Sequence, residues 1–116
     1  MAASYNRPVP GSVSSRWLPI LYRGFYDIPR AVLVEYEGDT YLLDCPFDER
    51  ADAYSDEFAV YGLPESTAKA VREPTSSWID LAESGTLLGR VPVVQVRFDE
   101  SRRRFLDSEV FRFLGY

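Results

Sequence analysis

Apolar and polar side chains alternate most clearly on the two sides of Gly38 and Asp39. Ala31–Tyr36 and Tyr41–Cys45 are predicted to be strands, and Gly38 at the first central position suits a type II′ turn, which needs a positive φ there. This turn predicts three cross-strand pairs on one face: Tyr36 with Tyr41, Val34 with Leu43, and Val32 with Cys45. We expect this face to lie in the core.

The opposite face of this hairpin is mixed to acidic, because successive side chains of a strand point to opposite faces. Its members are Leu33, Glu35, Glu37, Thr40, Leu42 and Asp44. We therefore expect this face of the sheet to be at least partly exposed to solvent.

Two further runs are predicted to extend the sheet. Asp56–Tyr61 predicts a third strand of a meander, which Gly62-Leu63-Pro64 ends. Val91–Phe98 alternates apolar and polar residues, so it predicts a strand with one face in the core. Arg103–Leu106 is predicted to pair back on that strand.

Prolines and glycines indicate where the chain changes direction. Trp17–Tyr22 contains Pro19, which has no N–H for a central ladder, so an edge strand or an extended arm is predicted there. Arg23–Pro29 predicts a turn, and Pro46–Ser55 predicts a loop of about ten residues, long for such a connection.

Helical periodicity is limited to short segments. Ser76–Ser84 has the i, i+3, i+4 apolar stripe of a short core-facing helix. Residues 108–114 predict a C-terminal helix, with a strand as the alternative because a short apolar run does not decide between them. Its predicted inner side chains are Val110, Phe111, Phe113 and Leu114. Glu65–Glu73 fits a weak helix and an irregular loop equally well.

Together these elements predict an α+β fold built on an antiparallel β-meander of four to five strands. It carries one short helix near 76–84 and a C-terminal helix, and curling of the sheet into a small barrel is an alternative. The 116 residues fit one domain, which we assign to 16–116. Residues 1–15 are rich in Ser, Pro, Gly and Ala and are predicted to form a flexible tail.

The chain has no histidine and one cysteine, Cys45. These counts exclude nucleophile activation by histidine and make a zinc site within this chain untenable. Cys45 is expected to be buried and inert, because it lies on the core face and nearby acids raise the pKa of a thiol. No cofactor is predicted, since no phosphate-binding glycine motif is present.

The sequence also predicts where the protein works. It contains no apolar run near the roughly 18 to 20 residues that cross a bilayer. Its first residues lack the apolar core of a secretory signal. A single cysteine is consistent with a reducing compartment, so a cytoplasmic protein without a membrane partner is expected.

Acidic residues are concentrated around the predicted hairpin. Residues 35–57 carry nine acids against Arg50 alone, a net charge of −8. This charge disfavours nucleic acid and attracts a basic protein partner. The basic cluster Arg102-Arg103-Arg104 is expected to pair with neighbouring acids of the same chain: Asp99, Glu100, Asp107 and Glu109.

These patterns favour a non-enzymatic protein-binding module, such as an inhibitor- or immunity-type protein or an adaptor. Tyrosine beside acid is typical of binding surfaces, because tyrosine buries a large area at low entropic cost. The candidate binding residues are Glu35, Glu37, Asp48, Glu49, Asp52, Tyr54, Asp56 and Tyr61. The alternative is a small enzyme that uses the carboxylates of Asp44, Asp48 and Glu49, whose oxygens could also hold Mg²⁺.

Overall fold

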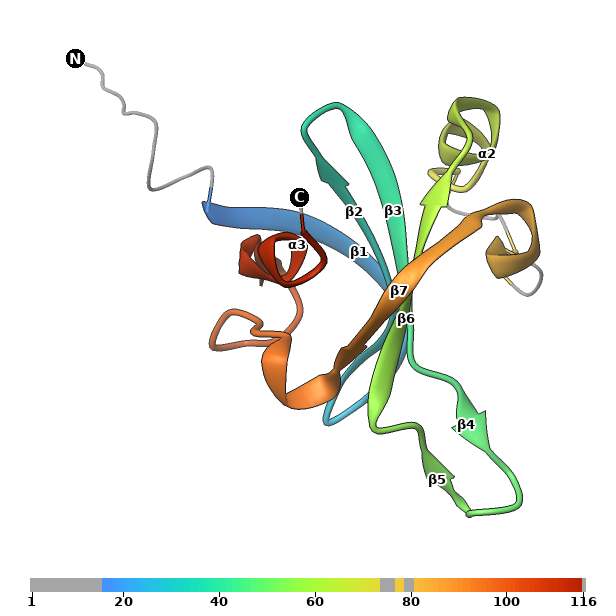
Figure 1. Ribbon diagram of the computed structural model, residues 1–116, viewed down its shortest axis with the longest axis vertical. Coiled ribbons are helices and arrows are strands. Elements are labelled where there is room, and N and C mark those ends of the chain that lie inside the picture. Colours follow the sequence, from blue (N-terminus) through green and yellow to red (C-terminus); the bar gives the residue numbers. More distant parts are fainter. Residues whose placement is uncertain (1–15, 74–76, 79–80, 116) are drawn as a thin grey trace.

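An antiparallel sheet of six strands dominates the computed structural model, which describes residues 16–73, 77–78 and 81–115 (Figure 1). The strands are β1 (Trp17–Tyr26), β2 (Ile28–Tyr36), β3 (Asp39–Asp44), β6 (Glu57–Leu63), β7 (Thr86–Pro92) and β8 (Phe105–Asp107). A separate two-stranded hairpin consists of β4 (Phe47–Asp48) and β5 (Ala53–Tyr54). The helical elements are α2 (Glu65–Ala70), α3 (Glu109–Phe113) and two 3₁₀ turns, η1 (Leu81–Ser84) and η2 (Val93–Gln95).

The strand order across the large sheet is β7-β6-β3-β2-β1-β8. The prediction of an antiparallel meander is therefore confirmed, but the prediction of four to five strands is too low. The chain passes from β1 through β7 between neighbouring strands, and β8 then returns to pair with β1 on the side away from β2. Because β7 and β8 lie at opposite ends of the order, the sheet is not a closed barrel.

The central hairpin of β2 and β3 turns one residue earlier than predicted. Glu37 (φ 51°) and Gly38 (φ 88°) occupy the two turn positions, and both positive φ values are those of a type I′ turn. Val34 therefore faces Tyr41 instead of Leu43, so the predicted pairs are wrong by two residues. A slip of two residues keeps every side chain on its predicted face, whereas a slip of one reverses the faces.

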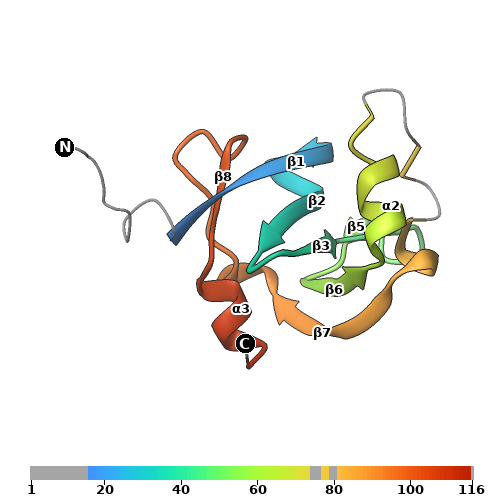
Figure 2. The same ribbon diagram turned by 90° about the horizontal axis from the view of Figure 1, so that it is seen from above.

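The first core lies on the face predicted from the hairpin. It combines buried side chains of β2, β3, β6, β7, β8 and α3 with two residues of connecting segments, Cys45 and Val96. The members from the named elements are Val32, Val34, Tyr41, Leu43, Phe58, Val60, Val91, Leu106, Val110 and Phe111. The ring of Tyr36 is stacked parallel to that of Phe111, with the centroids 4.3 Å apart. Helix α3 thereby covers this face of the sheet (Figure 2).

A second, smaller core lies on the opposite face. Leu33 and Leu42 are buried there against Val71 and Leu81. The expectation that this face is at least partly exposed is confirmed at Glu35 and Glu37, while Leu33, Thr40 and Leu42 are buried. Glu65–Glu73, which fitted a weak helix and an irregular loop equally well in sequence, contains helix α2. This helix lies on the opposite side of the sheet from α3 and covers the leucines (Figure 2).

The first strand is longer and more central than expected. β1 continues through Tyr26, so the predicted turn over Arg23–Pro29 is reduced to Asp27, whose φ is 66°. β1 has β2 on one side and β8 on the other, which makes the prediction of an edge strand wrong. Pro19 is tolerated because pairing with β2 begins one residue later, at Ile20.

The predicted strand Val91–Phe98 is wrong in its position. The strand here is β7, and Val93–Gln95 turns away as η2, leaving Val94 85% exposed. Phe98 keeps only an isolated bridge to Leu106, while β8 pairs along its length with β1. Pro92 lacks a ladder N–H, which accounts for the end of the strand at this residue.

The remaining predictions are resolved in part. Residues 1–15, 74–76 and 79–80 lie outside the described residues, so the predicted tail is not tested. Of the predicted helix Ser76–Ser84, residues 77–78 are not helical and Leu81–Ser84 form the 3₁₀ turn η1, so the described residues do not form the predicted helix. The C-terminal helix is confirmed as α3, with Val110 and Phe111 buried, but Phe113 is 54% exposed and not on the inner side. No helix in the described part of the chain has the length and apolar character to span a membrane.

A buried carboxylate joins three elements at one end of the sheet. Asp107, 1% exposed at the end of β8, accepts hydrogen bonds from Arg16 Nε (3.2 Å) and Nη2 (2.9 Å) and from the backbone N of Glu109 (3.0 Å). Burial raises the pKa of Asp107, but the bonds from Arg16 and Glu109 outweigh it and hold the pKa below its ordinary value. Asp107 thereby ties the start of β1 and of α3 to β8.

Replacement of the turn glycine tests the observed hairpin geometry. Gly38→Val is expected to lower the free energy of unfolding by about 1–3 kcal/mol, because a β-branched residue resists a positive φ. Asp39→Val is the control, because this exposed neighbour starts β3 and should tolerate the change within about 0.5 kcal/mol. Denaturant titration of both variants checks this, and a neutral Gly38→Val would contradict the type I′ turn.

The depressed pKa of Asp107 predicts an acid-sensitive fold. Its contribution to stability is complete above the ordinary aspartate pKa, near 4, and is lost as the pH falls through the lower folded-state value. Asp107→Asn should cost about 1–3 kcal/mol at pH 7 and should reduce the further loss of stability between pH 5 and pH 2. Thermal unfolding across this pH range measures both, and equal acid sensitivity of the two proteins would show that Asp107 is not the responsible group.

Candidate functional site

The β4–β5 hairpin projects beyond the large sheet between β3 and β6 (Figure 1). Phe47 pairs with Tyr54, and Asp48 pairs with Ala53. Asp48 Oδ1 closes the turn by accepting hydrogen bonds from the backbone N atoms of Arg50 (2.9 Å) and Ala51 (3.3 Å). The segment Pro46–Ser55, predicted to be a loop, therefore contains a two-stranded hairpin, and its turn is closed by an aspartate that bonds to the backbone two and three residues ahead.

Aromatic rings from distant parts of the chain meet on this hairpin. The ring of Tyr54 contacts Phe47 edge-on at 5.1 Å between centroids, and it contacts Tyr26 at 5.5 Å. Tyr26 is the last residue of β1, and it is 61% exposed, while Phe47 is 48% exposed. Three aromatic side chains thus form one cluster that is open to solvent.

Arg30 fixes the base of this cluster. Its guanidinium lies 4.4 Å from the Tyr54 ring centroid, and its Nε donates to the carbonyl oxygen of Tyr26 (3.0 Å). Its Nη1 donates to Cys45 Sγ at 3.4 Å, and the Cys45 thiol donates to the carbonyl oxygen of Ser55 at 3.1 Å. A stacked and hydrogen-bonded arginine therefore ties the hairpin to the β1–β2 turn.

Cys45 has the buried position that was predicted for it. The side chain is 2% exposed and belongs to the first core. The backbone N of Cys45 donates to the carbonyl oxygen of Arg30 (2.7 Å), so both main chain and side chain anchor the hairpin.

Four exposed acidic residues lie on or directly beside this hairpin: Asp48, Glu49, Asp52 and Asp56. We use the term aromatic tip for these four acids together with Tyr26, Arg30, Phe47 and Tyr54. An open depression of about 710 Å³ runs along the hairpin part of the tip. Five of the eight predicted binding residues are in the tip, and Tyr26, Arg30 and Phe47 were missed by sequence reasoning.

The other three predicted binding residues lie elsewhere. Glu35 lies near the end of β2, Glu37 occupies the turn into β3, and Tyr61 packs against the second core. The structure therefore divides the predicted surface into two separate ends (Figure 1).

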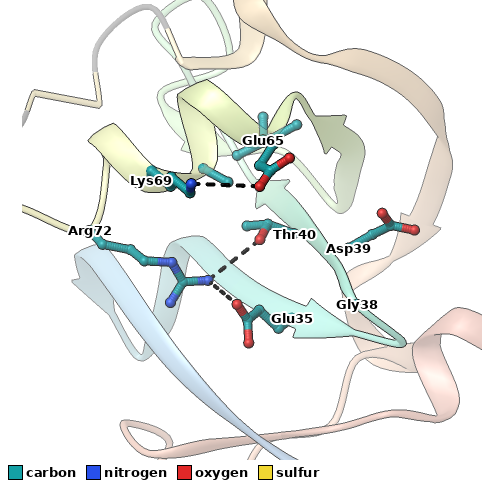
Figure 3. A pocket seen from close by; sticks show the side chains of 9 residues that line it. Glu35, Gly38, Asp39, Thr40, Glu65, Lys69 and Arg72 are labelled. Atoms are coloured by element: carbon teal, nitrogen blue, oxygen red, sulfur yellow. Dashed lines mark hydrogen bonds and ion pairs between the residues drawn. The ribbon is translucent and has the colours of Figure 1, made fainter.

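Glu35 borders a hollow of about 270 Å³ between the β2–β3 turn and α2 (Figure 3). The Nη2 atom of Arg72 donates to Glu35 Oε2 at 2.7 Å and to the Thr40 hydroxyl at 3.4 Å. Across the hollow, Lys69 lies 3.6 Å from Glu65. Glu35 and Glu65 each have a cation partner, so these carboxylates do not converge as an acid–base pair.

The carboxylates of the enzyme alternative have different environments. Asp44 ends β3 and is partly buried, and this burial raises its pKa. Asp48 closes the hairpin turn, and Glu49 is exposed. Within 16–73, 77–78 and 81–115, no three His, Cys, Asp or Glu side chains are grouped so that they could hold a metal ion.

The side chains of the basic cluster at 102–104 form no ion pair with the predicted acids within the described residues. Instead, the guanidinium of Arg103 lies 4.0 Å from the ring centroid of Phe25, and Arg102 donates to the carbonyl oxygen of Asp27 (3.3 Å). Asp99 accepts hydrogen bonds from Ser101, Phe105 and Arg104 within this turn. Burial raises the pKa of Asp99, but these hydrogen bonds outweigh burial and lower the pKa to about 2.

No protein-family model matches the chain, and no significant match is found among curated proteins or solved structures.

Proposed function

We propose that this protein is a non-enzymatic protein-binding module and that the aromatic tip docks a basic partner protein. The observation that carries the proposal is the solvent-open cluster of Tyr26, Phe47 and Tyr54, with four exposed acids on or beside the same hairpin. Binding hot spots are enriched in aromatic residues and arginine, surrounded by groups that exclude water. An inhibitor of a basic enzyme and an adaptor both fit this description.

The charge around the tip supports a basic partner over a neutral one. The four tip acids are exposed, and Arg30, the cation at the base of the cluster, is engaged by Tyr54, Tyr26 and Cys45. Complementary charge speeds association and selects partners more than it adds affinity. The aromatic rings are therefore expected to contribute most of the affinity. The acids are expected to raise the association rate and to select basic partners.

The rigidity of the tip also supports a binding role. Arg30 and Cys45 hold the hairpin against the sheet before any partner arrives. A surface that is already ordered loses less conformational entropy on binding, and more of the contact energy then appears as affinity.

Site-specific photo-crosslinking identifies the partner and tests the surface together. A photoreactive phenylalanine analogue at Phe47 should capture one or a few basic proteins from lysate of the source cells at low salt, and capture should fall at high salt. The same analogue at Glu100, an exposed position outside the tip, is the control. Equal capture from both positions, or capture of acidic proteins insensitive to salt, would contradict the proposal.

Charge neutralisation tests the steering role with the identified partner. The fourfold change of Asp48, Asp52 and Asp56 to Asn and Glu49 to Gln should slow association several-fold and flatten its salt dependence, because steering arises from the summed charge. The fold should persist, since exposed charges contribute little to stability and the asparagine introduced at position 48 keeps an Oδ1 acceptor for the turn. Association kinetics at several salt concentrations measure the effect.

The matched control changes four exposed acids outside the tip: Glu37, Asp39, Glu65 and Glu73. It alters the net charge by the same amount, so an equal effect of both fourfold variants would assign the steering to net charge alone. If instead a single change at Asp44, Asp48 or Glu49 abolishes a catalytic activity or the binding of Mg²⁺, the enzyme alternative replaces this proposal.

Truncation of an aromatic ring tests the source of affinity. Phe47→Ala should raise the Kd for the partner about tenfold or more, mainly through faster dissociation, because it removes an anchor ring that the bound partner would bury. Phe113→Ala removes a similarly exposed ring from α3 and should leave the Kd unchanged. Calorimetric titration of both variants checks this, and an unchanged Kd for Phe47→Ala would place the interface elsewhere.

A further inference from the structure

The depression along the β4–β5 hairpin is lined by charge of one sign. Its charged side chains are those of Asp48, Glu49 and Asp56, and within the described part of the chain no cation lines it. None of these three acids forms an ion pair among the described residues. Asp48 closes the turn through Oδ1, which leaves its Oδ2 for a ligand. The depression therefore offers carboxylate oxygens that no group of this chain neutralises.

Two aromatic rings line the same depression. Phe47 and Tyr54 are cross-strand partners, and their ring planes are inclined at 82° with the centroids 5.1 Å apart. The face of an aromatic ring is the negative part of its quadrupole, so it attracts a cation that comes within about 6 Å. The rings and the acids of this depression therefore attract the same kind of group.

The chain already uses one of these rings to hold a cation. The guanidinium of Arg30 lies 4.4 Å from the centroid of Tyr54 and 5.9 Å from that of Tyr26. Arg30 does not line the depression, and its N–H groups donate to the carbonyl oxygen of Tyr26 and to Cys45 Sγ. The place for a planar guanidinium against Tyr54 is therefore filled from within the fold, while the depression itself stays open.

We propose that this depression binds the ammonium group of a lysine side chain. The inference rests on the proposed function, because the lysine belongs to the partner protein that docks on the aromatic tip. The ammonium lies against the ring of Phe47 and donates hydrogen bonds to the lining carboxylates. Lysine fits better than arginine, because a compact ammonium directs its three donors to separate acceptors, whereas a guanidinium binds as a flat plate and Arg30 already occupies that position at Tyr54.

A titration with a defined lysine compound tests the site without the partner. Nα-acetyl-lysine N-methylamide added to the full chain should cause weak but saturable NMR shift changes that are concentrated at residues 46–56. The norleucine analogue, which has a similar apolar side chain without the ammonium, should cause none. The arginine analogue should bind less tightly. Equal binding of the norleucine analogue, or tighter binding of the arginine analogue, overturns the assignment to lysine.

A conservative ring replacement separates the contribution of the ring from that of the acids. Phe47→Leu keeps an apolar side chain and every acid, and it should weaken binding of the lysine compound about two- to fivefold, because the quadrupole of the ring is lost. Phe113→Leu removes an exposed ring from α3 and is the control. If Phe47→Leu binds the lysine compound as tightly as the wild-type chain does, the acids alone attract the cation and the proposal is overturned.

The captured partner separates failure of this inference from failure of the proposed function. Replacement of the lysines in its crosslinked segment by glutamine, one at a time, should identify one lysine whose loss weakens docking. A partner that docks on the aromatic tip and tolerates every such replacement overturns the lysine inference and leaves the proposed function intact. If position 47 captures no more than the control position, the proposed function fails, and the inference about its partner fails with it.

Discussion

The pairing of β2 with β3 is the constraint on which the rest of the structure depends. Val32 and Val34 enter the first core from one face of this hairpin, and Leu33 enters the second core from the other. Because side chains alternate along a strand, a slip of one residue would remove all three from their cores at once. The turn at Glu37 and Gly38 sets that register. Helix α3 covers one face of the sheet, and α2 covers the other (Figure 2).

The aromatic tip is possible because it is attached to this double-sided sheet at several points. Cys45 continues from β3 into the hairpin and bonds Arg30 of β2 through its backbone N, while Arg30 stacks on Tyr54 and holds the carbonyl of Tyr26. The exposed rings are therefore held in place by Arg30 and Cys45, whose polar groups are hydrogen-bonded within the protein. A surface of this kind can present apolar area to a partner without a flexible loop.

The sequence predicted the structure well where side-chain alternation was strong. It predicted the structure poorly where the type and position of a turn determine the strand pairing. The faces of the central hairpin followed from alternation, but its cross-strand pairs did not, because a glycine is compatible with more than one turn type. Val91–Phe98 was misplaced because alternation continued past Pro92, where the chain in fact turns away as η2. The acids of the tip were found from charge density alone, whereas Tyr26 and Arg30 were missed because only the paired β1–β2 turn brings them beside Tyr54.

Hydrogen–deuterium exchange of the free and the partner-bound protein tests the central claim, that a fixed sheet presents the aromatic tip for docking. The amides of β2 and β3 should exchange slowest in both states, because they lie between the two cores. Partner binding should add protection at residues 26–30 and 46–56 and leave the β2–β3 turn unchanged. New protection at the β2–β3 turn and α2, with none at residues 46–56, would contradict the account.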